Sequence, residues 1–491
     1  MSFPYNTGSK QRQRIGFMKP SPIPECPQRA AMRDASPQLP LHPPGSWPPG
    51  PAPGMTGWGL LRRMSRDLPG SLDIWRRRYG DIVHLRIWPE HQIVVTDPGL
   101  VRELLVTQHD KLVRWERGIA VMSQLHGTSV LTAEGPVWRA RRQALQPRFA
   151  PKPVQSFVPV IEAAASRAFA RWRLDTGTWP IESAFTSLGM DVILRMMFSS
   201  DIDADARLAE RAVHTVSVAG NKEMFWPASW PDAMPWKRSK RAALALLRGL
   251  IERHVRARLA LAKAEWPDDL LTCLLTLHLE NPAEWSLEAV RNECMTAFIA
   301  GHETAAATLT WWAWCMAANR EAQAAAHSEV DAVLHGRAPR AQDLPALAYL
   351  TRTLQETLRL YPAAPVLLSR RSQQAIVLGG WQFPARTMFT VPLGLMQRDA
   401  RWFPDPDAFR PERFADDAPD IPRGAFMPFG AGPRVCMGQH LALAEMTVIA
   451  AMFLQRFSVA APQGMTPPEP VFNITLRPRE ALRLIVTRRA A

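Results

Sequence analysis

The sequence predicts a mainly α-helical protein with small β-sheets, in which one large domain follows an N-terminal tail. Many long segments place apolar residues at helical spacing, whereas the segments that alternate like β-strands are few and short. From residue 57 onward there is no internal repeat and no second low-complexity linker, so we expect a single domain at 46–491. The excess of helices excludes a Rossmann or barrel layout.

The tail, residues 1–45, contains Lys10, Arg12 and Arg14, several prolines and few apolar residues. Because it cannot bury a core and has no hydrophobic signal-peptide segment, we expect it to be disordered. Three methionines are compatible with the start of translation: Met1, Met18 and Met32.

The helices are predicted where apolar residues recur three or four positions apart. In chain order they cover residues 59–79, 98–108, 135–149, 151–174, 181–198, 207–221, 238–265, 286–318, 321–334, 346–360 and 441–457. Strands are predicted at 82–87, 91–96, 375–378, 387–392 and 475–486, the last of them interrupted by arginines. The long helix at 286–318 carries His302 and Glu303 in its middle, where a bilayer would disfavour them, so we expect a buried helix and no transmembrane anchor.

The formal net charge of +14 comes from basic residues scattered among the helices. No nucleic-acid-binding motif accompanies them, so we expect no nucleic-acid partner. A basic surface suits an acidic protein or an anionic membrane. The 5 cysteines have an odd count and irregular spacing, which argues against a disulfide scaffold or a zinc site and favours a reducing, cytoplasmic setting.

The segment 429–438 places one cysteine, Cys436, in a loop punctuated by glycines. A thiolate is a strong donor to iron and needs nearby hydrogen-bond donors and positive charge to stay deprotonated. Gly438 allows close approach to the sulfur, Arg434 supplies a cation, and Phe429 can shield the sulfur from water. A lone cysteine is more often a small buried hydrophobe, so the whole pattern carries the assignment.

This pattern, F-x-x-G-x-R-x-C-x-G, resembles the haem-ligand loop of the cytochrome P450 family. The resemblance implies that the sulfur of Cys436 is the proximal, metal-binding ligand of haem b. It also implies the family's fold, a helical prism with a minor sheet region, and one haem-thiolate catalytic domain.

The segment 300–304, Ala-Gly-His-Glu-Thr, is similar to the oxygen-activation motif of the same family. By that resemblance Thr304 would hold a hydrogen-bonded water where dioxygen binds, and Glu303 would deliver protons from solvent. From the residues alone, the Thr304 hydroxyl can bond a carbonyl one turn back and open the helix locally. The other interpretation is a satisfied threonine beside an acid that faces a buried cation.

The segment 356–359, Glu-Thr-Leu-Arg, places an acid and a base on one helix face. An isolated pair of this kind is common on protein surfaces. Pro-Glu-Arg-Phe at 411–414 matches the family's third member, so Glu356, Arg359 and Arg413 resemble its buried structural triad, which braces the loop carrying Cys436.

Trp138 and Arg142 resemble the W-x-x-x-R element that meets a haem propionate in the family, and their spacing puts both on one side of a helix. Arg370 occupies the position of another propionate-binding arginine, although Arg371 leaves that assignment open by one residue. By the same resemblance Arg434 would be a third such arginine.

The resemblance implies monooxygenation of a lipophilic small molecule such as a fatty acid or terpenoid. No flavin or iron–sulfur module is present in the sequence, so electrons from NAD(P)H would arrive through a separate ferredoxin or flavodoxin with its reductase. Arg139 and Arg141 are candidates for the surface that docks this partner.

The substrate pocket is implied by the resemblance and is mostly apolar. Its residues would include the segment 114–131 and a group of six further positions: Phe225, Ala297, Ala300, Val366, Leu367 and Ile474. The C-terminal half looks most like the branch that includes bacterial fatty-acid hydroxylases. Two alternatives stay open, namely a peroxygenase or isomerase of the same fold and a non-catalytic haem sensor or lipid-binding protein.

Overall fold

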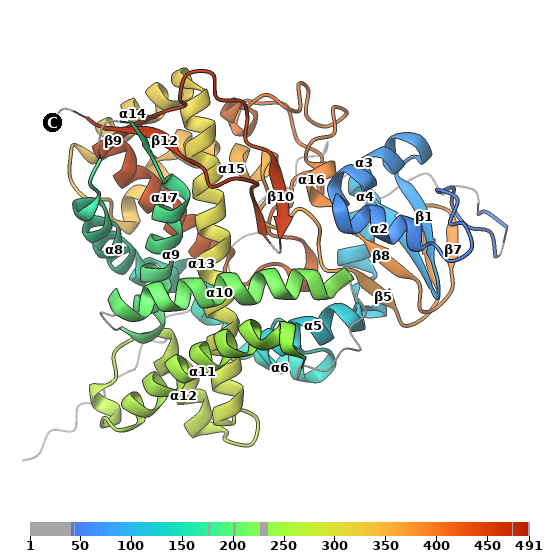
Figure 1. Ribbon diagram of the computed structural model, residues 1–491, viewed down its shortest axis with the longest axis horizontal. Helices are drawn as coiled ribbons and strands as arrows, with labels where there is room; N and C mark the ends of the chain where they lie inside the picture. Colours follow the sequence, from blue (N-terminus) through green and yellow to red (C-terminus); the bar gives the residue numbers. More distant parts are fainter. Residues whose placement is uncertain are drawn as a thin grey trace, which may run out of the picture. The chain divides into compact units, whose positions relative to one another are not determined.

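The computed structural model describes residues 41–43, 45–174, 177–199, 203–225, 234–473 and 475–489. Helices dominate these segments and the strands are short, as the sequence predicts (Figure 1). The predicted tail lies outside the described residues except for 41–43 and 45, and the three possible translation starts lie outside them too.

The helices follow one another along the whole described chain. They are α2 (Trp58–Arg66), α3 (Leu68–Tyr79), α4 (Pro98–Arg102), α5 (Glu116–His126), α6 (Gly135–Leu145), α7 (Pro151–Val154), α8 (Val158–Arg171), α9 (Ile181–Phe198), α10 (Asp203–Phe225), α11 (Arg238–Leu259), α12 (Leu270–Glu280), α13 (Leu287–Ala318), α14 (Arg320–Leu334), α15 (Ala348–Leu360), α16 (Leu393–Met396) and α17 (Gln439–Arg456).

Several predicted helices differ from those observed. The helix predicted at 59–79 is two helices, because Asp67 leaves the helical conformation and its side chain accepts a hydrogen bond from the Gly70 amide at 3.0 Å. Sequence analysis missed α12, because its nearly continuous apolar run shows no helical period. It also missed α5, because Gly118 interrupts the helical pattern of the sequence there, although the helix itself is continuous.

The strands form one larger and three smaller sheets within the described segments. They are β1 (Ile82–Ile87), β2 (Glu90–Val95), β3 (Leu112–Arg114), β4 (Thr178–Trp179), β5 (Arg370–Ser372), β6 (Ile376–Leu378), β7 (Trp381–Phe383), β8 (Met388–Thr390), β9 (Phe457–Ala460), β10 (Pro470–Asn473), β11 (Thr475–Pro478) and β12 (Leu484–Arg488). The predicted strand 475–486 is two strands, β11 and β12, which belong to different sheets.

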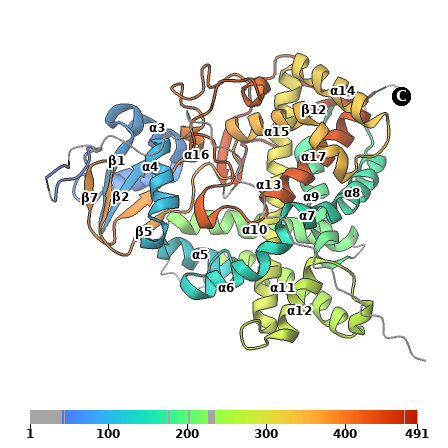
Figure 2. The same ribbon diagram turned by 180° about the vertical axis from the view of Figure 1, so that it is seen from behind.

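The larger sheet has the order β1-β2-β8-β5-β3. Its β2–β8 pair is parallel and the others are antiparallel. In the β3–β5 pair Arg114 stands opposite Arg370, so both side chains leave the sheet on the same face. In both views this sheet lies beside α2 and α3, away from α11 and α12 (Figures 1 and 2).

The central helix α13 is fixed by close packing against α9. A Cβ on Gly189 would stand 3.1 Å from the His302 carbonyl oxygen, and a Cβ on Gly301 would stand 2.8 Å from Ile193 Cδ1. The two helices therefore approach more closely than larger residues would allow. Farther along α13, the buried indole of Trp312 donates to the Thr353 hydroxyl of α15 at 2.9 Å.

Within the described ranges no helix is both long enough and apolar enough to cross a membrane.

Candidate active site

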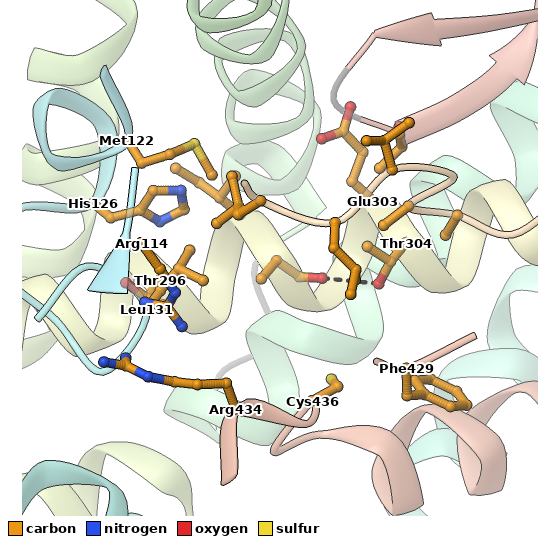
Figure 3. A pocket seen from close by; sticks show the side chains of 18 of the residues that line it. Arg114, Met122, His126, Leu131, Thr296, Glu303, Thr304, Phe429, Arg434 and Cys436 are labelled. Atoms are coloured by element: carbon orange, nitrogen blue, oxygen red, sulfur yellow. Dashed lines mark hydrogen bonds between the residues drawn. The ribbon is translucent and has the colours of Figure 1, made fainter. Parts of the chain in front are cut away.

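A cavity of about 1450 Å³ lies beside the middle of α13. Cys436 lines it from the loop before α17, Thr304 from α13, and Arg114 from β3 (Figure 3). Much of the remaining wall is apolar and comes from several elements: Leu131, Ile193, Met196, Met197, Val366 and Leu367. A space of this size and character suits a large cofactor together with a lipophilic ligand.

The Cys436 loop is held by its own backbone. The Cys436 amide donates to the Phe429 carbonyl at 2.9 Å, which folds the loop back on itself. Gly432 has a φ of 71°, and a Cβ there would stand 2.1 Å from the Leu105 carbonyl oxygen. Only glycine satisfies both conditions, so the loop conformation depends on Gly432.

Cys436 is exposed to the cavity while protein atoms surround it on its other sides. Burial raises the pKa of its thiol, and the Gly438 amide and the Arg142 guanidinium oppose that rise. Cys273 also lines the cavity, but burial raises the pKa of its thiol without a backbone donor to oppose it. Cys294 and Cys315 are buried in the core. Of the cysteines in the described segments, Cys436 is thus the one best placed to act as a ligand.

Two glycines of this loop give contrasting predictions. Gly432→Ala is expected to lower the free energy of unfolding by several kcal/mol, because of the positive φ and the carbonyl contact together. Gly438→Ala is the matched control, since Gly438 has a φ of −83° and a Cβ would meet nothing within 4 Å. Urea unfolding measures both. Equal stability losses would contradict the role given to Gly432.

Four arginines gather at the sheet side of the cavity: Arg114, Arg142, Arg370 and Arg434. Arg434 stacks on the Trp138 ring at 3.7 Å, donates to the Ala133 carbonyl at 3.0 Å and forms an ion pair with Glu134. Glu134 is the carboxylate that acts on Arg114, Arg370 and Arg434 alike. Positive charge therefore exceeds negative charge at this wall.

Burial and the excess positive charge lower the pKa values of these arginines. Burial, followed by the Arg434 and Arg370 cations, lowers the pKa of Arg114 to about 9. Burial also lowers the pKa of Arg370 to about 10. The buried Nε and Nη1 atoms of Arg114 have no hydrogen-bond partner among the described residues. Unpaired donors and uncompensated cations at a buried wall require an anionic ligand. The residues present fit a haem, because the arginines would bind its two propionates and the Cys436 sulfur would bind its iron.

The other predicted cofactor residues also lie at the cavity. Trp138 and Arg142 of α6 line it, and Arg142 Nη1 donates to the Val435 carbonyl at 2.9 Å. Phe429 and Gly438 line it beside Cys436. Arg371 instead leaves the sheet on the other side and pairs with Glu90 at 2.6 Å, so the cavity-facing residue of the two is Arg370.

The prediction that Arg141 belongs to a partner-docking surface is wrong. Arg141 is buried, donates to the Thr128 carbonyl and forms an ion pair with Glu293 of α13 at 3.0 Å. Arg139 of the same helix is exposed.

Glu303 and Thr304 leave α13 in different directions (Figure 3). The Thr304 hydroxyl donates to the Ala300 carbonyl one turn back at 2.9 Å, which leaves its oxygen free to accept a hydrogen bond in the cavity. Glu303 is buried, accepts from the Ser217 hydroxyl at 2.9 Å and lies 3.5 Å from the Arg477 guanidinium. Burial raises the pKa of Glu303, and Arg477 opposes that rise. The carboxyl thus holds a proton more firmly than a free glutamate.

The predicted triad comes together away from the cavity. Arg359 and Glu356 are fully buried and form two hydrogen bonds at 2.7 and 2.8 Å, and Arg413 Nε reaches Glu356 at 3.2 Å. Arg359 also donates to the Gln397 and Pro406 carbonyls at 2.8 and 2.7 Å. These contacts tie α15 to the chain segment that leads into the Cys436 loop.

Sequence analysis did not single out Gln397, which continues this link. Its buried side chain donates to the Leu358 carbonyl of α15 at 2.9 Å and accepts from the Met427 amide at 3.2 Å. Met427 lies two residues before Phe429, so one amide joins α15 to the start of the loop. Nothing in the local sequence marks Gln397, because both of its partners are distant in the chain.

Of the predicted substrate-pocket residues, Ala297, Ala300, Val366 and Leu367 line the cavity. Ile474 and the side chain of Phe225 lie outside the described residues. The cavity also receives residues that were not predicted, among them Met196 and Met197 of α9.

The chain is similar to known proteins over most of its length. A family model described as "Cytochrome P450" matches residues 48–485. Among curated relatives, "Protein LUTEIN DEFICIENT 5, chloroplastic" of Arabidopsis thaliana is 29% identical over 84% of this chain and 72% of the relative. "Cyclooctat-9-en-7-ol 5-monooxygenase" of Streptomyces melanosporofaciens is 30% identical over 89% of this chain and 95% of the relative. "Carotene epsilon-monooxygenase, chloroplastic" of Arabidopsis thaliana is 28% identical over 78% of this chain and 76% of the relative.

Proposed function

The chain belongs to the cytochrome P450 family and is a P450 monooxygenase, and on this premise we propose that it oxidises a terpenoid. The family membership implies haem as cofactor. The observation that carries the proposal is the position of Cys436, which faces a large, mainly apolar cavity that also holds Thr304 and the arginine cluster. When bound, haem supplies the chemistry that places one atom of dioxygen in a C–H or C=C bond while the other leaves as water.

The residues of this chain would hold the cofactor at its iron and at its propionates. The sulfur of Cys436 would bind the iron, and the Gly438 amide and Arg142 would stabilise its negative charge. Arg114, Arg370 and Arg434 would bind the propionates, which supplies the unpaired Nε and Nη1 of Arg114 with acceptors.

Proton delivery would use the α13 pair. Thr304 Oγ1 would accept a hydrogen bond from a water in the cavity, because its own proton is engaged by Ala300. Glu303 would hold the next proton at its carboxyl, and the Ser217 hydroxyl would keep that carboxyl oriented. The apolar wall excludes other water from the site.

Two relatives support a terpenoid substrate over a fatty acid. The names of these relatives give a carotene and a cyclic alkenol as the molecules acted on. Both are water-insoluble carbon skeletons, and the apolar wall formed by Leu131, Ile193 and Met197 suits such a molecule.

Electrons would come from NAD(P)H through a separate ferredoxin or flavodoxin and its reductase, as the sequence predicts. The exposed Arg139 on α6 supports a docking surface of positive charge on the side of the Cys436 loop. A cytoplasmic location is proposed with it, because Cys273, Cys294, Cys315 and Cys436 are all unpaired.

The test compares two ways of driving turnover in purified, haem-loaded protein. With NADH and surrogate redox proteins, a terpenoid such as cedrol is expected to give a product that carries one more oxygen atom. Thr304→Val should lower the product formed per NADH by roughly tenfold or more, because proton transfer contributes at least that much. Product with hydrogen peroxide, together with no product under NADH and the redox proteins, would indicate a peroxygenase and contradict the proposal.

A further inference from the structure

Two buried polar atoms in the cavity wall are not explained by the haem site. His126 Nδ1 and Thr296 Oγ1 have no hydrogen-bond partner within the described part of the chain, and their residues are only 2% and 8% exposed. Both residues line the cavity, and Figure 3 shows them on the α5 side of it. Burying an unpaired donor or acceptor is costly, so a partner for these atoms is expected in the cavity.

Thr296 differs from the other threonines of α13. The hydroxyls of Thr304, Thr308 and Thr310 each donate to the carbonyl one turn back, at 2.9, 2.9 and 2.8 Å. The Thr296 hydroxyl makes no such bond among the described residues and stays available to a ligand.

His126 is a neutral group in this wall. It is the last residue of α5, and Gly127, with a φ of 64°, turns the chain away immediately after it. Burial lowers the pKa of its imidazole to about 4, so at neutral pH the ring offers one donor and one acceptor. A neutral imidazole and an unpaired hydroxyl in one cavity wall suit an alcohol or a ketone, because neither group carries a charge to set against a carboxylate. Arg114 on the same side is the residue that the haem propionates would occupy.

Helix geometry relates this pair to the reacting end of the cavity. Thr296, Ala300 and Thr304 are four residues apart, so they share one face of α13. Eight residues of helix at 1.5 Å each separate Thr296 from Thr304 by about 12 Å along the axis.

We propose that His126 and Thr296 form a hydrogen-bonding site for an oxygen already present on the substrate. The inference rests on the proposed function and narrows its substrate class: the molecule is an oxygenated terpenoid, an alcohol or a ketone. Its oxygen is held at the α5 side, and the position oxidised lies at the other end of the molecule, on the Thr304 side. The preceding enzyme in the reaction sequence must therefore install an oxygen.

Binding of matched ligands to the full, haem-loaded chain tests this. Borneol and cedrol are compared with their parent hydrocarbons, bornane and cedrane, by equilibrium dialysis, which needs no turnover. Wild type is expected to bind each alcohol at least about tenfold more tightly than its hydrocarbon, because the hydrocarbon leaves the polar pair unpaired. Lauric acid serves as the carboxylate probe and is expected to bind more weakly than cedrol.

The variants assign the preference to these side chains. Thr296→Val and His126→Phe should each reduce the alcohol preference to about twofold and leave hydrocarbon affinity within about twofold of wild type. Thr310→Val is the matched control, because it removes a buried α13 hydroxyl that already has a partner. It should keep the full preference.

Several results would overturn the inference. These are equal affinity of wild type for alcohol and hydrocarbon, no binding of either, tighter binding of lauric acid, or equal losses of alcohol and hydrocarbon affinity in the two variants. A preserved alcohol preference without any oxidised product under NADH-driven conditions would instead refute the proposed terpenoid oxidation and leave the binding site standing.

Discussion

Replacing Cys436 by serine is expected to abolish both the spectroscopic signature of the protein and its turnover. Reduced wild-type protein under carbon monoxide should show the red-shifted Soret band of a thiolate-ligated haem, and Cys436→Ser should lose that band. Product formation should fall to the level of a sample without protein, because the electron density donated by the thiolate is what favours O–O cleavage. Difference spectra and product analysis measure the two effects.

The structure supplies a sharp control for this result. Cys273 is the other described cysteine that lines the cavity, so Cys273→Ser removes a second thiol of the same site. It should retain the red-shifted band and the turnover. Loss of the band in Cys273→Ser, with retention in Cys436→Ser, would show that Cys273 binds the iron and that Cys436 does not.

The second large effect is expected at the buried triad. Glu356→Gln leaves Arg359, which is fully buried, without its carboxylate partner. Removing one member of such a pair costs about 3–5 kcal/mol of the free energy of unfolding, because the remaining charge stays desolvated. Haem content should fall as well, since Arg359 holds the Gln397 and Pro406 carbonyls of the segment that leads into the Cys436 loop.

Glu469→Gln is the matched control, because it makes the same chemical change in an exposed ion pair. Glu469 and Arg479 are 63% and 59% exposed, so water and salt screen their interaction. Urea unfolding of the two variants should show a large loss for Glu356→Gln and almost none for Glu469→Gln. Similar losses would mean that the triad does not brace the fold.

Local sequence was sufficient where the signal is local. The ends of α9 and β1 match the predicted ranges, because α9 is a long, mainly apolar run and the burial of β1 alternates from residue to residue. The positive φ of Gly432 and the back-bonded hydroxyl of Thr304 also follow from short-range geometry that a sequence motif can encode.

Sequence analysis failed where a residue distant in the chain determines the position of a side chain. Arg114 was expected only as part of a pocket segment, because β3 is too short to be recognised and its pairing with β5 places Arg114 opposite Arg370. The same pairing decides between Arg370 and Arg371, since adjacent strand residues point to opposite faces. Arg141 was misassigned because its partner, Glu293, lies on another helix.

The glycine-mediated contact of α9 with α13 bears on how this enzyme diversifies. A side chain at Gly189 would press on the His302 backbone, and one at Gly301 would push Ile193 aside, so substitutions there are expected to shift α13 relative to α9. A change of substrate preference is then expected from side chains that face the cavity, such as Thr296 and Leu131, while the α9–α13 contact stays intact.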